Sequence, residues 1–281
     1  KSYEKGEFPI NIIPKLSKLN IIGGLLKKYG CPGLSKNEFI IVLLEISKVD
    51  LSLATFMGVQ VSLVMETIYN LGSENQKNHY LPKLANLEYI GGFGLTEPKH
   101  GSDSLFMEAT CEKTDNGFST GYVLNGEKRW IGNATIANFI IVFAKNITNQ
   151  QTINRGEICG FIVPFGTPGL QIKKIEYKSG LRIVQNADII LENVYLNERM
   201  LLPHCKSFAS LNKTLLPSRF YVSWSATGAL LGAYEKCYKY LENRKQFNNP
   251  LLSYQLIQER LVFVLMNLQS MFFLNLEGNR L

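Results

Sequence analysis

The sequence predicts an α+β chain in which an N-terminal α-helical domain, a middle β domain and the start of a C-terminal helical bundle follow one another. Three observations lead to this. Residues 1–90 show helical periodicity with few turn signals, short strand-like runs follow, and helical periodicity returns past Pro203. At roughly 100–200 residues per domain, 281 residues leave room for more than one domain. The boundaries that we expect are 1–90, 91–205 and 206–281.

The N-terminal part carries helix start signals. Ser35–Glu38 reads S-x-x-E, a capping box in which the serine oxygen accepts from a first-turn amide and the glutamate reaches back. A second helical stretch runs from about Leu51 to Leu71 and stops at Gly72. Ser73 and Gln76 form another capping box, which opens a helix to about Leu84. This part is therefore predicted to be an α domain.

From about Gly91 the helical pattern gives way to turn residues and strand-like runs. Asp115-Asn116-Gly117 and Asn125-Gly126 are typical of hairpin turns, because Asn and Gly tolerate the positive φ that such turns need. No long helical pattern lies between the strand-like runs, so we expect an antiparallel β-barrel or sandwich rather than βαβ units. The runs are Gly121 to Leu124, Asn138 to Lys145, Ile158 to Pro164, Leu170 to Tyr177 and Ala187 to Leu196.

The C-terminal part is again helical. One stretch runs from about Pro217 to Arg244, and a second runs from Leu251 to the end. The sequence opens at Lys1 without Met or a signal-peptide pattern, and it stops at Leu281 inside an apolar-periodic stretch. We therefore expect both ends to be cut and the bundle to be truncated.

Composition excludes several classes. Hydrophobic residues make up 46% and charged residues 19%, which is the mix of a soluble globular protein. No window holds about 18 uninterrupted apolar residues, so we expect no membrane partner. The net charge of +7 suits a phosphate-bearing ligand as well as ordinary lysine-rich faces, and no arginine-rich or RNA-module signature appears, so no nucleic-acid partner is expected. The five cysteines and three histidines are scattered, so no metal site is expected.

Familiar catalytic signatures are also missing. The sequence has no P-loop, no G-x-S-x-G elbow, and no GxGxxG at Gly91, Gly92 and Gly94. Two stretches stand out instead, Gly92 to Asp103 (GFGLTEPKHGSD) and Lys128 to Asn133 (KRWIGN).

From the residues alone these two stretches have two interpretations. They are either an ordinary polar turn at the edge of the β domain, or a platform for a planar, hydrogen-bonding ring. In the second case Thr96 and loop amides donate to the heteroatoms of the ring, Trp130 covers an apolar face, and Ser102 holds an anionic group.

The two stretches resemble known signatures. GFGLTEPKHGSD resembles the flavin loop of the acyl-CoA dehydrogenase and oxidase superfamily, and KRWIGN resembles its W-I-[TG]-N element. Arg244-Lys-Gln-Phe247 with Gln255 and Gln258 resembles the R-x-x-F…Q element of its C-terminal bundle. The similarity covers essentially the whole chain in the right order, and it implies the acyl-CoA dehydrogenase fold.

The resemblance implies FAD as cofactor and an acyl-CoA as substrate. The family removes an α proton and a β hydride from the thioester and gives the trans-2-enoyl-CoA. It implies a homo-oligomer, a tetramer, in which Arg244, Phe247 and Gln255 reach the FAD of a neighbouring subunit. Substrate binding is expected from Ser102 and Arg219. The residues expected to line the flavin in the same subunit are Phe93, Gly94, Leu95, Thr96, Ser102, Trp130, Ile131 and Gly132.

Within the superfamily the chain resembles the branch of glutaryl-CoA dehydrogenase and the plant short-chain peroxisomal acyl-CoA oxidase. Ala54 stands where the glutaryl enzymes carry an arginine for the distal carboxylate, and Gly132 stands where dehydrogenases usually have threonine. We therefore favour an oxidase of fatty-acid β-oxidation that uses O2 in the peroxisome. The alternatives are a dehydrogenase that passes electrons to an electron-transfer flavoprotein, in the mitochondrial matrix, and a non-catalytic acyl-CoA-binding homologue or inactive fragment.

The catalytic base has no candidate in the sequence. The Y-E-G-T-like element that supplies it in this branch does not occur before Leu281, and the other family position is occupied by Ser218. Glu97 adjoins the flavin loop, but the following proline indicates a structural role. We expect the base beyond Leu281 and assign no catalytic residue in this chain.

Overall fold

The computed structural model describes residues 2–115 and 120–278, and helices, strands and helices follow in the predicted order. The chain divides into two compact units. The first unit contains residues 1–34 and 55–218, and the second contains residues 35–54 and 219–281.

The helices at the start of the first unit lead into the sheet. Ser73 and Gln76 form the predicted capping box, with the Ser73 amide donating to Gln76 Oε1 over 2.9 Å. The side-chain Nε2 of Gln76 also donates to the carbonyls of Arg199 and Leu201, both at 2.9 Å, so this cap ties the helix to the end of the β region. The elements are α1 (Ser2–Lys5), η1 (Ile10–Ile12), α2 (Ile13–Lys18), α4 (Leu51–Gly58, which begins in the second unit), η2 (Val59–Met65), α5 (Glu66–Leu71) and α6 (Glu74–Ala85).

The predicted helix from Leu51 to Leu71 contains a π-helical segment, Val59–Met65, which the sequence pattern did not indicate. By length and composition alone, this stretch and Gln255–Gly278 are the two in the described ranges that could cross a membrane. The first is a core helix, two-thirds buried, whereas the apolar window of the second is not buried. Apolar composition on all sides is what burial in a core also produces, so the first stretch carries no membrane argument.

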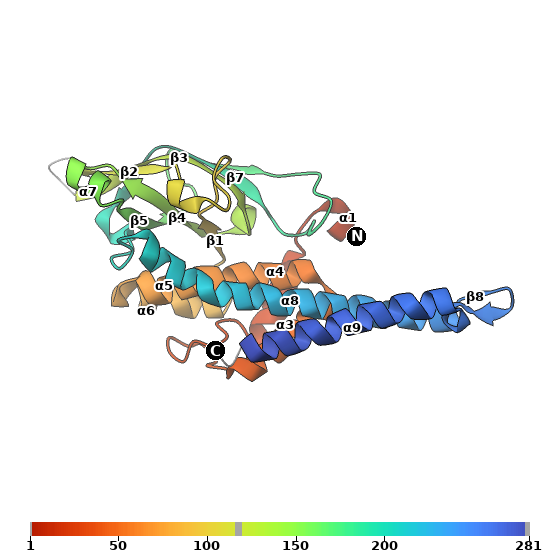
Figure 1. The fold of residues 1–281 in the computed structure, drawn as a ribbon. Coiled ribbons are helices and arrows are strands. Elements are labelled where there is room, and N and C mark those ends of the chain that lie inside the picture. The colour runs from red at the N-terminus through yellow and green to blue at the C-terminus, as the bar shows by residue number, and fades with distance from the viewer. Residues whose placement is uncertain (1, 116–119, 279–281) are drawn as a thin grey trace. The chain divides into compact units, whose positions relative to one another are not determined.

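The sheet of the first unit has seven strands in the order β1-β4-β2-β3-β7-β6, with β5 on the other edge of β4 (Figure 1). Most pairs are antiparallel, as expected, but β1 and β2 both pair with β4 in parallel. Both strands therefore share one edge of β4, and the chain between them, residues 95–109, forms a loop at that edge. The strands are β1 (Gly91–Gly94), β2 (Thr110–Asp115), β3 (Thr120–Ile131), β4 (Phe139–Asn146), β5 (Ile158–Pro164), β6 (Leu170–Lys174) and β7 (Ala187–Asn197).

Short helices punctuate the strands, and apolar side chains fill the space that the sheet encloses. Among the buried core residues are Leu124, Val142, Phe161, Ile189 and Val194, each with less than one per cent of its surface exposed. The short helices are η3 (Ser104–Phe106), η4 (Ala134–Ile136), α7 (Gln150–Asn154) and η5 (Glu198–Met200).

The turn predicted at Asn125-Gly126 is wrong, because β3 runs through it. The register against β7 shifts next to Gly126, whose φ is 138°, and this marks a β-bulge. A Cβ at Gly126 would lie 2.6 Å from Ala109 Cα, so the glycine serves a close backbone approach instead of a hairpin. The other predicted turn, Asp115-Asn116-Gly117, lies partly outside the described residues, although Asp115 pairs with Thr120 across an antiparallel ladder.

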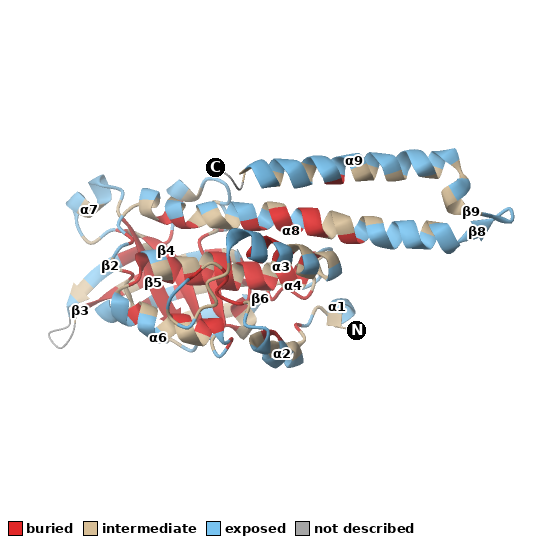
Figure 2. Cartoon of the chain, turned by 90° about the horizontal axis from the view of Figure 1, so that it is seen from below, coloured by how far each residue is buried: buried red, intermediate tan, exposed pale blue. Residues whose placement is uncertain are grey.

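The second unit is built on three helices. A Cβ on Gly228 would lie 2.8 Å from the Leu44 carbonyl oxygen, so a glycine is needed where α8 packs on α3. α8 also contacts α9, with the rings of Trp224 and Phe272 edge to face at 5.5 Å. Much of α9 is exposed (Figure 2). The elements are α3 (Lys36–Val49), α8 (Phe208–Asn243, which begins in the first unit), β8 (Lys245–Gln246), β9 (Asn249–Pro250), η6 (Leu251–Ser253) and α9 (Gln255–Gly278).

Candidate functional site

The GFG stretch forms the short strand β1, which lies between β4 and the end of β3. A Cβ at Gly94 would lie 3.1 Å from the Ile141 carbonyl oxygen, and one at Gly92 would lie 3.4 Å from the carbonyl oxygen of Gly132. The absence of side chains at these glycines lets the backbone of β1 approach both neighbours. The structure therefore places the GFG start of the first signature against the IGN end of the second, KRWIGN.

A backbone hydrogen bond joins the two signatures directly. The amide of Arg129 donates to the carbonyl oxygen of Thr96 over 2.8 Å. Thr96 is half-buried, while Phe93, Leu95 and Ile131 are buried. Of these four residues, Thr96 is therefore the most exposed.

Trp130 has an unusual backbone for a bulky residue. Its φ is 63°, in the left-handed region, and its side chain is 52% exposed. The Arg129 guanidinium lies 5.4 Å from the ring centroid, and the Trp130 carbonyl accepts from the side-chain amide of Asn186 at 3.0 Å. A non-glycine residue in this region is strained, and such strain concentrates at functional sites. The strand end therefore presents an aromatic face to the surface at a conformational cost.

Ser102 lies on the same loop as Thr96, in an exposed segment between Gly101 and Asp103. Its predicted role in holding an anionic group stays a prediction. Closer to the start of this loop, a backbone hydrogen bond forms a turn: the amide of Glu97 donates to the His100 carbonyl at 3.1 Å.

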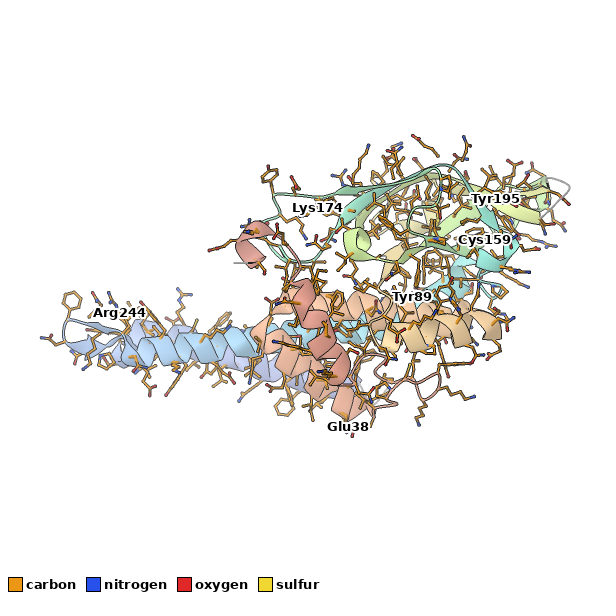
Figure 3. All side chains as sticks on the ribbon, turned by 180° about the vertical axis from the view of Figure 1, so that it is seen from behind. Glu38, Tyr89, Cys159, Lys174, Tyr195 and Arg244 are labelled. Carbon is orange, nitrogen blue, oxygen red and sulfur yellow. The ribbon has the colours of Figure 1, made fainter. Side chains whose placement is uncertain are left out.

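The remaining predicted residues belong to the second unit. Arg219 is exposed on α8. The β8–β9 hairpin follows Arg244, carries Phe247 in its loop and leads to Gln255 at the start of α9. Figure 3 shows Arg244 where α8 ends. The two loop residues of this hairpin, Phe247 and Asn248, have φ values of 50° and 63°, as a two-residue type I′ turn requires. Phe247 is 90% exposed, so the hairpin tip carries a solvent-facing aromatic ring.

Gln60 holds the backbone at the start of β1 in place, and the sequence analysis did not single it out. It is fully buried in the π-helical segment, and its Nε2 donates to the carbonyls of Leu84 at 3.1 Å and Tyr89 at 2.8 Å. Its Oε1 accepts from the amide of Gly91 at 3.0 Å. One side chain thus fixes the end of α6 and the start of β1. A carboxamide with valines on both sides, Val59 and Val61, was the signal that could have found it.

Asn133 supports the other signature. Its Nδ2 donates to the Phe56 carbonyl at 3.2 Å, and its φ of 63° ends β3 in a left-handed turn. A Cβ on the neighbouring Gly132 would lie 3.0 Å from Val59 Cγ2, so the helical segment packs closely beneath the strand end. The π-helix therefore supports both β1 and the WIGN stretch.

The Glu97 carboxylate in the loop is already engaged by other groups. Glu97 Oε1 accepts from the amide of Ala109 at 2.9 Å and from Lys128 Nζ at 2.8 Å. Burial alone would raise the pKa of Glu97, but the Lys128 charge and the backbone amides outweigh it and hold this pKa below its ordinary value. Ser218, at the other family position for the base, donates its hydroxyl to the Leu215 carbonyl within α8. In residues 2–115 and 120–278 no three His, Cys, Asp or Glu side chains are grouped as a metal would require.

Comparison with known proteins gives matches along nearly the whole chain. The acyl-CoA dehydrogenase N-terminal domain matches residues 1–88, the middle domain matches residues 92–194, and the C-terminal domain matches residues 208–277. The three matches follow in the order of the helices, sheet and helices described above.

Individual relatives give the same result. A probable acyl-CoA dehydrogenase of Bacillus subtilis is 34% identical over 267 residues, which are 94% of this chain and 69% of that protein. A short-chain-specific acyl-CoA dehydrogenase of Megasphaera elsdenii is 32% identical over 271 residues, 95% of this chain and 69% of that protein. A crystal structure of a glutaryl-CoA dehydrogenase from Mycobacterium smegmatis in complex with FADH2 superposes with a TM-score of 0.91 at 32% identity, covering 99% of this chain and 69% of the other.

Proposed function

The chain belongs to the acyl-CoA dehydrogenase family, and from this premise we propose that it binds FAD and serves the α,β-dehydrogenation of acyl-CoA thioesters. The observation that carries the proposal is the 2.8 Å hydrogen bond from the Arg129 amide to the Thr96 carbonyl. It places the LTEP loop beside the exposed ring of Trp130, which is the arrangement that a planar cofactor with a hydrogen-bonding edge requires.

The residues present fit a flavin. An isoalloxazine ring has large apolar faces and a polar edge, and Trp130 offers an exposed aromatic face at a register shift of β3 against β7, where its φ is positive. Thr96 offers a partly accessible hydroxyl, and Gly132 leaves its own position without a side chain. The M. smegmatis relative was crystallised with the reduced cofactor, which supports FAD over a smaller flavin.

The division of labour follows from these groups. FAD, when bound, supplies the hydride acceptor. Thr96 and the loop amides orient the polar edge of the ring, and Trp130 covers one face and excludes water there. Ser102 and Arg219 are proposed to hold the anionic part of the substrate. The base that removes the α proton is not assigned to a residue of this chain.

For the electron acceptor we propose a protein partner, an electron-transfer flavoprotein. Its support is that each of the three relatives described above is a dehydrogenase. Molecular oxygen is the second candidate, and Gly132 favours it. This is the position at which the resemblance places a threonine in dehydrogenases.

The test uses the natural protein at its natural length. It should purify with FAD and oxidise a short acyl-CoA when an electron-transfer flavoprotein and a dye acceptor are supplied, with little hydrogen peroxide formed in air. Stoichiometric peroxide with no gain from the flavoprotein would make it an oxidase. Protein that takes up no FAD would overturn the function altogether.

A further inference from the structure

An ion pair between Glu97 and Lys128 joins the LTEP loop to β3. Lys128 Nζ is 2.8 Å from Glu97 Oε1, and the Lys128 and Glu97 side chains are 0% and 3% exposed. Removing two charges from water costs free energy that their attraction offsets only with good geometry, so such a pair is weak evidence for stability. A buried pair with a defined geometry does fix the relative position of the two segments that carry it.

Lys128 holds more than its carboxylate partner. Its Nζ also donates to the Leu95 carbonyl oxygen at 3.3 Å, and the Met107 sulfur lies at 4.0 Å. The Leu95 carbonyl belongs to the peptide bond that joins Leu95 to Thr96. One ammonium group therefore holds the backbone immediately before Thr96 and the side chain of Glu97 immediately after it.

Glu97 in turn closes the loop at its base. Its Oε1 accepts from the Ala109 amide at 2.9 Å, and its other oxygen accepts from the Glu108 amide. The Glu97 carboxylate thus links the two ends of the segment from Glu97 to Glu108, which contains Ser102. With the Arg129 amide on the Thr96 carbonyl, the backbone around Thr96 is fixed from both sides.

The charges are consistent with this arrangement. The pKa of Glu97 is held below its ordinary value, so the carboxylate is ionised at neutral pH. Burial lowers the pKa of Lys128, while the Glu97 charge opposes that shift. Each group therefore depends on the other to remain charged out of solvent, and removing one partner alone leaves an uncompensated charge.

We propose that Lys128 is a positioning residue for the cofactor: through the Leu95 carbonyl and the Glu97 carboxylate it sets the backbone on which Thr96 meets the flavin edge. This inference rests on the proposed function. It assigns to Lys128 no contact with FAD or substrate. It predicts that losing Lys128 weakens flavin binding by more than its effect on folding explains.

The test separates position from stability with two variants and a control. Lys128→Met removes the ammonium, and Glu97→Gln with Lys128→Met removes both charges while keeping an oxygen acceptor at residue 97. Lys113→Met breaks the pair with Glu198, which spans 3.1 Å between side chains that are 43% and 51% exposed. For each protein we would measure the melting temperature of the apoprotein, the FAD dissociation constant by fluorescence titration, and the visible circular dichroism of bound flavin.

Lys128→Met should lower the melting temperature and raise the FAD dissociation constant about tenfold or more, because one hydrogen-bonded charge is lost. In the double variant the melting temperature should recover, since no charge is orphaned, while the FAD dissociation constant stays raised and the flavin dichroism stays altered. Lys113→Met should change neither quantity. If Lys128→Met does not fold, the double variant carries the test.

Two outcomes contradict the proposal in different ways. If the FAD affinity of the double variant returns to the wild-type value together with its melting temperature, Lys128 acts through stability alone and the positioning role is wrong. If wild-type protein binds no FAD, the proposed function fails first.

Discussion

The backbone amide of Arg129 donates to the carbonyl oxygen of Thr96 over 2.8 Å and so joins two segments that are 33 positions apart in the chain. Parallel pairing of β1 with β4 places the loop that carries Thr96 at the edge where β3 ends. The bond keeps the half-buried Thr96 beside the exposed ring of Trp130.

Trp130→Ala should weaken FAD retention, because it removes the aromatic face beside the loop. A base or ring stacked on an aromatic side chain is worth about 1–3 kcal/mol, so the FAD dissociation constant should rise roughly tenfold. Tyr177→Ala is the matched control, since Tyr177 is also exposed and also has a positive φ, 54°. Equal FAD affinities for the two variants in a fluorescence titration would contradict a stacking role.

Gln60→Leu should destabilise the first unit by about 2–3 kcal/mol, because the carbonyls of Leu84 and Tyr89 and the Gly91 amide would lose their buried partner. Chemical denaturation measures the loss. Gln171→Leu, at an exposed position on β6, should change stability by less than about 0.5 kcal/mol. Similar denaturation midpoints for both variants would show that the Gln60 bonds contribute little.

Stability should fall as acid titrates Glu97. Its pKa is lowered in the folded state, so the unfolded state binds the proton more readily, and the contribution of Glu97 is present above the ordinary carboxyl pKa. That contribution is lost as the pH falls through the lower folded-state pKa. Glu97→Gln should therefore flatten the acid limb of a plot of melting temperature against pH, and an unchanged acid limb would contradict this.

Monocarboxylic acyl-CoAs of short or medium length should be preferred over glutaryl-CoA. Ala54 is fully buried and offers only a methyl group where glutaryl enzymes are expected to carry an arginine. An unpaired buried carboxylate costs at least about 1–3 kcal/mol, which corresponds to a roughly ten- to hundred-fold loss in kcat/KM. Steady-state kinetics with butyryl-CoA and glutaryl-CoA compare the two directly, and a higher kcat/KM for glutaryl-CoA would refute the prediction.

Phe247→Asn should stabilise the β8–β9 hairpin by about 1 kcal/mol, because asparagine tolerates the left-handed backbone that a phenylalanine occupies with strain. If Phe247 reaches the cofactor of a neighbouring subunit, the same variant should bind FAD less tightly. Thermal melting and FAD titration of one preparation measure both. A more stable variant with unchanged FAD affinity would leave the exposed ring without a cofactor role.

The order of the elements and both capping boxes were predictable from sequence because capping and helical periodicity are local. Ser35 accepts from the Glu38 amide, as the S-x-x-E pattern indicates. The parallel pairing of β1 was not predictable, since it depends on a contact with β4 some fifty residues later. At Asn125-Gly126 a turn-like dipeptide served a close approach to Ala109, and only the fold supplies that neighbour.

The candidate site divides in the same way. Thr96 and Trp130 were found through their signatures, whereas Gln60 and the Glu97–Lys128 pair became visible only once the segments were placed in space. Lys128 reads as an ordinary solvated lysine in sequence, but it is fully buried. The charge of Lys128 is paired with Glu97, which lies 31 positions away in the sequence, so the pair cannot be recognised from local sequence.

The most direct test of the central claim is a visible-absorption titration of the purified apoprotein with FAD, followed by anaerobic addition of butyryl-CoA. We predict saturable uptake of about one FAD per chain and a change in the flavin spectrum when the acyl-CoA is added. Protein that remains colourless after FAD is added and excess ligand removed, or flavin whose spectrum does not respond to the acyl-CoA, would contradict it.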